Sequence, residues 1–226
     1  EGADLMTGGR RRCIAVSTLA EVKFYSDVGY DDILYTGYLD RAKIEVCAKF
    51  AETINSFHIL LDSYYIVELL RDRVLKDDKK WSVFMDVDCG YHRSGVDPSE
   101  YNGVGLAVSL MSEANIFFCG LYIHCGNAYN CASVEEVAIV ADDSAKKAKD
   151  FAQKLRYYYA VRKMKRHKVN FPHIALGSTP TCSQPVPSMK DEVTEWHPGN
   201  YIFYDVEQQS LGSCKAYDIA VQVLTE

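Results

Sequence analysis

The 226-residue chain contains no uninterrupted run of eighteen or more apolar residues, so the sequence predicts no membrane-spanning helix. Its eight cysteines include no Cys-x-x-Cys pair, and the chain has no Asn-x-Ser/Thr glycosylation site. This pattern is typical of reduced intracellular thiols rather than of a disulfide-stabilised secreted domain, and we expect a cytoplasmic protein. The net charge of −6 argues against a nucleic-acid-binding protein.

The chain also lacks low-complexity tracts, and 48% of its residues are hydrophobic, so a folded protein with a full core is expected. It has neither an initiator methionine nor a signal-like apolar segment at its start, and its end, DIAVQVLTE, resembles a strand cut short. We therefore expect the sequence to be part of a longer protein, in which a targeting segment can precede residue 1.

Short apolar segments alternate with segments of helical spacing along the chain. The predicted strands are residues 13–18, 32–37, 57–62, 81–89, 117–125, 173–178 and 201–206. The longest predicted helix runs from Ser133 to about Arg166, with apolar residues three or four positions apart. Alternating strands and helices predict a parallel sheet, and strands that are apolar throughout indicate that both sheet faces are covered.

This alternation predicts an α/β fold of one of two kinds. A TIM-type (β/α)8 barrel that lacks its first strand is favoured over an open doubly wound sheet. The reason is that polar residues follow the carboxyl end of strand after strand, which is where the barrel fold builds its sites.

Two segments near the end of the chain have the composition of an anion-binding site. In HIALGSTPTCSQP, Gly177 follows a predicted strand and is followed by Ser178 and Thr179. A glycine lets the backbone approach a ligand, and hydroxyls and successive amides can hold an anion. In HPGN, Gly199 and Asn200 offer further backbone N–H groups. An ordinary polar turn explains the first segment equally well.

Other strand ends carry side chains suited to a flat, charged ligand. Arg93 follows the strand at 81–89, where its charge and fork-shaped head suit a carboxylate or phenolate; a surface ion pair is the alternative. Tyr122 and His124 are two residues apart and therefore share one face of their strand, although a buried structural histidine would look the same.

Two further features favour ordinary structural roles. Asp86 and Asp88 alternate at a strand end, but no His or Cys lies at ligand spacing, so no metal site is predicted. Seven Lys or Arg residues lie between Lys154 and Lys168. Cations are favoured at the carboxyl end of a helix, so a solvated helix end is preferred over a surface for RNA or another polyanion.

Several motifs occur together in a fixed order: VSTLAEV, GYDDILYTGYL, MDVDCGYHRSGV, GLYIHCGNAY, LGSTPTCS and HPGNYIFYD. In this order they resemble the fold-type III pyridoxal-phosphate enzymes, specifically the D-serine dehydratase and D-threonine aldolase branch. The resemblance covers almost the whole chain. It implies that Gly177, Ser178 and Thr179 bind the cofactor phosphate, with Gly199 and Asn200 as the second phosphate-binding segment.

The same resemblance implies roles for five other residues. His124 corresponds to the histidine that lies against the pyridine ring, and Tyr122 and Tyr129 to tyrosines that line the cofactor pocket. Arg93 corresponds to an arginine near the phenolic oxygen of the cofactor or the substrate carboxylate. His197 stands where alanine racemases of this fold have an arginine facing the pyridine nitrogen; a polar cap is the other interpretation.

The resemblance also implies an activity, the conversion of D-serine to pyruvate and ammonia with the help of zinc. A D-threonine aldolase and a non-catalytic cofactor-binding protein are the alternatives. The Schiff-base lysine of the family precedes the region that matches residue 1, and the zinc ligands lie in a carboxyl-terminal β domain. We therefore expect an incomplete barrel at residues 1–216, the start of a second domain at 217–226, no turnover by this chain alone, and a homodimer in the full-length form.

Overall fold

The computed structural model describes residues 1–161 and 173–224. The chain forms two compact units, each built from two stretches of sequence. Unit 1 comprises Glu1–Asp86 and Gly95–Leu121, and unit 2 comprises Val87–Ser94 and Tyr122–Glu226. The expected domain boundary between residues 216 and 217 stays a prediction.

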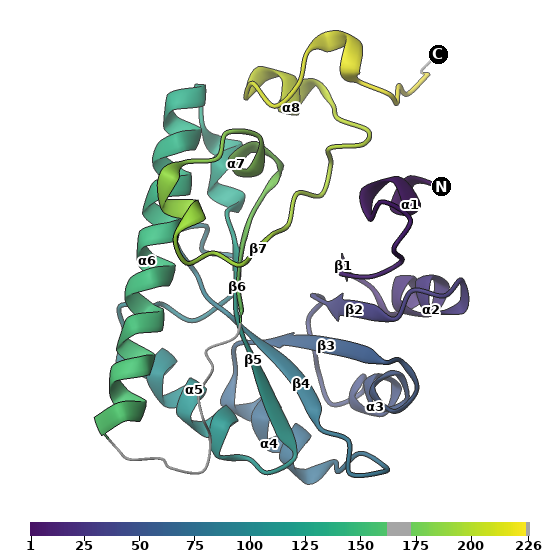
Figure 1. Cartoon of the computed structure of the whole chain (residues 1–226), viewed down its shortest axis with the longest axis vertical. Helices are drawn as coiled ribbons and strands as arrows, with labels where there is room; N and C mark the ends of the chain where they lie inside the picture. Colours follow the sequence, from purple (N-terminus) through teal and green to yellow (C-terminus); the bar gives the residue numbers. More distant parts are fainter. Residues whose placement is uncertain (162–172, 225–226) are drawn as a thin grey trace. The chain divides into compact units, whose positions relative to one another are not determined.

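Unit 1 alternates strands with helices. Its elements are α1 (Gly2–Met6), β1 (Ile14–Val16), α2 (Leu19–Asp27), β2 (Asp32–Tyr35), α3 (Ile44–Thr53), β3 (Ser56–Leu61), α4 (Tyr64–Asp72), β4 (Trp81–Asp86), α5 (Tyr101–Ser112) and β5 (Ile116–His124), which enters unit 2 at Tyr122. Strands β1 to β4 pair in parallel, and α2 and α3 lie beside them (Figure 1). Parallel pairing requires such crossover helices between consecutive strands.

Local sequence explains how the unit 1 helices begin. Thr18 caps α2: its hydroxyl accepts the Glu21 amide while the Glu21 carboxylate accepts the Thr18 amide, which satisfies two otherwise unpaired donors. Ser63 caps α4 in a simpler way, by accepting the Tyr65 amide. The side chains of Ile33, Ile59 and other residues of the parallel strands are fully buried, as expected for a sheet covered on both faces.

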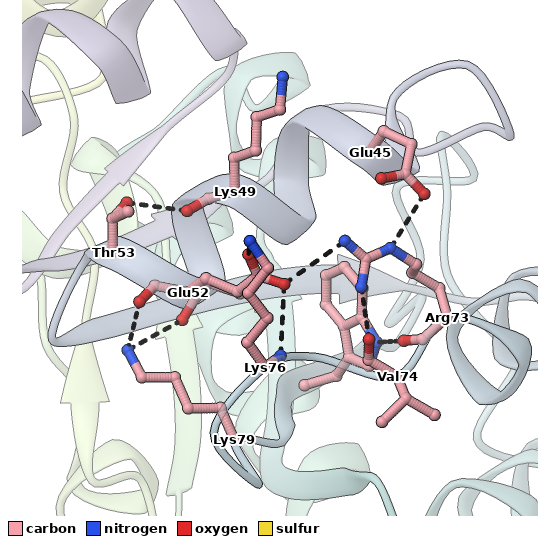
Figure 2. A network of polar contacts seen from close by, with 10 residues as sticks. Glu45, Lys49, Glu52, Thr53, Arg73, Val74, Lys76 and Lys79 are labelled. Atoms are coloured by element: carbon pink, nitrogen blue, oxygen red, sulfur yellow. Dashed lines mark hydrogen bonds and ion pairs between the residues drawn. The ribbon is translucent and has the colours of Figure 1, made fainter.

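A polar network fixes the connection between α4 and β4 (Figure 2). The guanidinium of Arg73 donates to Glu45 over 2.9 Å and contacts Glu52 over 3.4 Å. The Glu52 carboxylate also accepts the Lys76 amide over 3.3 Å, and the Arg73 carbonyl accepts the indole N–H of buried Trp81 over 2.7 Å. The network joins α3, the connecting segment and the first residue of β4.

Unit 2 is organised around a long helix. Its elements are η1 (Gly126–Asn130), α6 (Val134–Val161), β6 (His173–Gly177), α7 (Thr179–Ser183), η2 (Pro187–Lys190), β7 (Glu195–Trp196), α8 (Val206–Ser210) and η3 (Ala216–Asp218). Helix α6 packs against β6, α7, η1 and η2, and Figure 1 shows it running alongside β6 and α7. Its predicted apolar stripe is buried from Val137 to Tyr159, and the first predicted member, Val134, is half-buried.

The seven strands form a sheet in chain order, which confirms the expected α/β class. Six of the predicted strands overlap β1 to β6, with β3 and β5 each beginning one residue before the predicted range. The predicted strand at 201–206 is wrong: residues 201–203 form a turn, and the last strand is β7. Asp205 instead caps α8 by accepting the Gln208 amide, and Tyr204 has a left-handed φ of +50°, which a strand does not allow.

Two other findings concern the basic segment and the membrane. The part of the predicted basic helix end beyond Val161 lies outside the described residues. Within residues 1–161 and 173–224, every helix is too short or too polar to cross a lipid bilayer.

Candidate functional site

The end of β6 has a backbone that only glycine fits. Gly177 has φ +150°, and its carbonyl accepts the Cys125 amide over 3.0 Å at the end of β5. A Cβ atom at this position would lie 2.6 Å from the sulfur of Cys182 and 3.4 Å from the backbone nitrogen of His197. The absence of a side chain therefore lets three segments of unit 2 meet at one point.

Buried hydroxyl groups follow this glycine. Ser178, Thr179 and Thr181 are almost completely buried. The Thr181 hydroxyl accepts the Ser178 amide over 2.9 Å, and the Ser178 carbonyl accepts the Cys182 amide over 3.0 Å. Buried hydroxyls need hydrogen-bond partners, and Ser178 and Thr181 provide partners for each other.

Thr179 joins the two segments that the sequence predicts to bind an anion. Its Oγ1 atom accepts the backbone amides of Gly199, over 3.1 Å, and Asn200, over 2.8 Å. The Asn200 side chain in turn donates to Asp205 over 2.6 Å, which ties the segment to the start of α8. The predicted amide donors are thus beside the predicted hydroxyls, and in this structure the Thr179 hydroxyl occupies them.

Three aromatic rings lie next to these segments. The rings of Tyr122 and His197 stack with centroids 4.3 Å apart and an interplanar angle of 16°. The rings of His124 and His197 are 6.5 Å apart and inclined by 25°. The end of β5 and the segment before Gly199 therefore present nearly parallel rings, an arrangement that the spacing of Tyr122 and His124 does not itself predict.

Both imidazoles are neutral at pH 7. Burial, and to a lesser extent the neighbouring His124, lowers the pKa of His197 to about 4. Burial and the charge of Arg93 lower the pKa of His124 to about 4, although a backbone hydrogen bond with Gly177 acts in the opposite direction. Both ring nitrogens of His197 are buried, and neither has a hydrogen-bond partner among the described residues.

Arg93 reaches this site through Tyr91, a residue that the sequence does not single out. The guanidinium carbon of Arg93 lies 5.3 Å from the centroid of the Tyr91 ring, and the Tyr91 ring meets His124 edge-on at 5.7 Å. No local pattern marks Tyr91, because the strand end that its ring meets lies far along the chain, at His124.

Two predicted residues are less constrained by the structure. Tyr129 packs against the cluster of Ala128, Val137 and Leu211, and its place beside a ligand stays a prediction. Gly199 has open space around it, because an added Cβ would meet no atom within 4 Å. Only its backbone amide, bonded to Thr179, takes part in the site.

A second polar cluster, which no motif in the sequence marks, lies in unit 1. His58 Nε2 is 3.3 Å from Asp32 Oδ1, and its Nδ1 is 2.7 Å from Ser82 Oγ and 3.5 Å from the sulfur of Cys119. Burial lowers the pKa of His58, but the hydrogen bonds to Asp32 and Cys119 outweigh it and raise the pKa to about 9. A histidine in an apolar strand was the only sequence signal.

The described part of the chain offers little for a metal ion. Among residues 1–161 and 173–224, no group of three or more His, Cys, Asp or Glu side chains is placed to hold one. The Asp88 carboxylate accepts the backbone amides of Gly90, Tyr91 and His92.

Comparison with known proteins places this geometry in a family. Residues 3–206 match the family described as alanine racemase, N-terminal domain. The chain is 35% identical to a D-serine dehydratase of Dictyostelium discoideum, covering 95% of this chain and 54% of the relative, and 26% identical to one of Schizosaccharomyces pombe, covering 100% and 56%. The chain thus spans about half the length of the curated relatives it matches.

The fold agrees with a solved structure. D-threo-3-hydroxyaspartate dehydratase from Delftia sp. HT23 superposes with a TM-score of 0.85 at 23% identity, covering 97% of this chain and 55% of that one. The expected alanine-racemase-like fold is therefore confirmed.

Proposed function

Because the chain belongs to the alanine racemase N-terminal domain family, we propose that it forms the pyridoxal-phosphate-binding part of a D-serine dehydratase. The observation that carries the proposal is the pair of hydrogen bonds from Gly199 and Asn200 to Thr179, in the same unit as the stacked Tyr122 and His197 rings. Segments about twenty residues apart thereby form one polar site beside aromatic rings.

The residues fit a flat heteroaromatic phosphate ester. Ser178 and Thr179 would hold the phosphate together with the amides of Gly199 and Asn200, which would donate to a phosphate oxygen in place of Thr179 Oγ1, because hydroxyls and adjacent amides complement an anion. Gly177 leaves the space in which a side chain would obstruct that approach. The unpartnered, buried nitrogens of His197 are suited to a ligand that brings its own hydrogen-bonding atom.

Each residue has a chemical task in this proposal. Bound pyridoxal phosphate would supply an electron sink that makes the α-hydrogen of an amino acid acidic. His197 would leave the pyridine nitrogen unprotonated, because an imidazole whose pKa is lowered to about 4 is neutral at pH 7 and offers that nitrogen at most one N–H hydrogen bond, not the charge of an imidazolium. Arg93 would bind the phenolic oxygen or the substrate carboxylate.

The substrate is proposed from the relatives, and the net reaction balances without an oxidant: D-serine gives pyruvate and ammonia. The names of the relatives at 35% and 26% identity support D-serine. No step is assigned to zinc, since the described residues do not form a site for it. The cytoplasmic location and the homodimer stay predictions.

Cofactor binding is tested on the 226-residue chain by equilibrium dialysis against pyridoxal phosphate and by the ³¹P resonance of the bound ester. Thr179→Val removes a hydroxyl that would contact the phosphate and that holds the Gly199 and Asn200 amides beside it, and it should weaken binding by about tenfold. Thr53→Val is the matched control, because the exposed Thr53 hydroxyl bonds only to carbonyls within α3. Equal affinity in the Thr179→Val variant and the wild type would contradict the phosphate site.

The activity is tested by giving D-serine and pyridoxal phosphate to this chain and to a longer protein that contains it, with lactate dehydrogenase to detect pyruvate. We expect pyruvate from the longer protein and none from the chain alone. D-Threonine distinguishes the alternatives, since a dehydratase releases 2-oxobutyrate and an aldolase releases glycine. Glycine as the main product, or cofactor binding without turnover of either substrate by the longer protein, would overturn the dehydratase assignment.

A further inference from the structure

The turn that follows β4 in the chain is organised by one carboxylate. Asp88 Oδ1 accepts the backbone amides of Gly90, Tyr91 and His92 over 2.9, 3.0 and 3.0 Å, and Oδ2 lies 2.9 Å from the His92 ring. Burial raises the pKa of Asp88, but these hydrogen bonds outweigh it and hold the pKa below its usual value. The acceptor is therefore a carboxylate at neutral pH, when it bonds most strongly.

The turn places the Tyr91 ring against Gly126 and His124. A Cβ atom on Gly126 would lie 2.3 Å from the Tyr91 ring, so the ring packs directly on the backbone of η1. The ring also meets His124 edge-on at 5.7 Å, a favourable arrangement for two aromatic rings. Helix α6 supports the turn from another side, since the Lys147 amine donates to the Cys89 carbonyl over 3.2 Å.

Arg93 depends on the same ring. Its guanidinium lies over Tyr91 at 5.3 Å, and otherwise the Arg93 side chain is exposed. Holding a long exposed side chain in one place costs rotamer entropy, so an attractive contact is needed to offset that cost. For Arg93 this contact is the cation–π interaction with the Tyr91 ring, which keeps the guanidinium near His124.

We propose that Asp88 and Tyr91 are positioning residues, which fix the turn and the ring that hold Arg93 beside His124 in the ligand-binding site. The inference deepens the proposed function and rests on it for the identity of the ligand. The juxtaposition of Arg93, Tyr91 and His124 does not depend on that identity.

The first test therefore uses the ligand-free chain. The imidazole of His124 is followed by ¹H–¹⁵N NMR between about pH 3.5 and 8, a range that brackets its lowered pKa, and assigned with His124→Gln. Arg93, Tyr91 and His197 face His124, and Arg93 is the cation among them. Asp88→Ala should raise the pKa of His124 by about half a unit or more, because the partly screened charge of Arg93 would no longer be held near the imidazole.

The effect of Asp88 on the pKa of His124 must act through Arg93. Arg93→Ala should raise the pKa of His124 by a similar amount, and the double variant Asp88→Ala/Arg93→Ala should exceed neither single variant, because both remove the same interaction. Tyr91→Phe keeps the ring and should titrate like the wild type, whereas Tyr91→Leu should resemble Arg93→Ala. Additive shifts, or no shift in any variant, would overturn the inference.

A control separates this effect from general loosening of the chain. Asp40→Ala removes a carboxylate that accepts the Lys43 amide over 3.1 Å in unit 1, and it should leave the titration of His124 unchanged. A shift in this variant equal to that in Asp88→Ala would show that the turn has no special role.

The second test measures pyridoxal phosphate affinity in the same variants. Asp88→Ala and Tyr91→Leu should bind the cofactor several-fold more weakly, and Tyr91→Phe should not. If the wild-type chain fails to bind pyridoxal phosphate, the proposed function fails while the His124 result stands by itself. If the wild type binds and all variants bind equally, the positioning role fails and the proposed function survives.

Discussion

At the scale of single residues, Gly177 shows how one missing side chain shapes the candidate site. Its φ is +150°, and a Cβ atom added to it would lie only 2.6 Å from the sulfur of Cys182, which leaves no room for substitution. Gly177→Ala should cost about 1 to 3 kcal/mol of unfolding free energy through backbone strain and displacement of Cys182. It should also weaken pyridoxal phosphate binding. Urea unfolding and equilibrium dialysis measure the two effects.

Gly199 provides the matched comparison for this prediction. It has no atom within 4 Å of an added Cβ and contributes its amide, which alanine retains. Gly199→Ala should therefore change the unfolding free energy by less than about 0.5 kcal/mol. Equal losses in the two variants would mean that chain flexibility, rather than the close approach at Gly177, determines the result.

At the scale of elements, the connection from α4 to β4 depends on Arg73. Its guanidinium bridges Glu45 and Glu52, and the side chain of Glu52 is only 11% exposed (Figure 2). Arg73→Ala would remove a partner from a poorly exposed carboxylate, which is costly. The urea midpoint of unfolding should fall clearly. Unfolding is monitored by the fluorescence of buried Trp81, whose indole donates to the Arg73 carbonyl.

Arg71, in the last turn of α4 and two residues before Arg73, is the control. It pairs with Asp72 over 3.0 Å, and the two side chains are 49% and 69% exposed. Such surface ion pairs contribute little, so Arg71→Ala should shift the urea midpoint by a small fraction of the Arg73→Ala effect. Similar shifts in both variants would indicate that the network is not a stabilising element.

At the scale of the whole molecule, the buried histidines predict a stability maximum near the ordinary histidine pKa of about 6.5. The pKa of His58 is raised to about 9, so its contribution is complete below about pH 6.5 and is lost as the pH rises toward 9. The pKa values of His124 and His197 are lowered to about 4, so the unfolded chain takes up protons first and stability falls from about pH 6.5 toward 4.

The measurement is urea unfolding at intervals between about pH 5 and 7.5, below the ordinary thiol pKa of about 8.5. His58→Gln should flatten the alkaline side, where the wild-type loss is at most about 1.4 kcal/mol per pH unit. His197→Gln should flatten the acid side. A flat wild-type curve would contradict the assignment.

Local pattern predicted much of the element order but failed at residues 201–206. The Tyr-Ile-Phe-Tyr composition favours a strand, yet Asp205 caps α8 and the Asn200 side chain bonds Asp205. These short-range hydrogen bonds outweigh a weak strand preference, which depends on neighbours to pair with. The stripe of α6 is predictable for the opposite reason, since its helical period is a property of the sequence alone.

The sequence by itself determined the strands β1 to β6, the buried face of α6 and the residue types at the strand ends, because these follow from periodicity and backbone preference over a few residues. Only the tertiary structure decided which of those residues meet. Thr179 with Asn200, Tyr91 with Gly126 and His58 with Cys119 are separated by 21 to 61 positions, and no local pattern encodes such contacts. Their pairing, and the pKa shifts that burial causes, arise when the packed units exclude water.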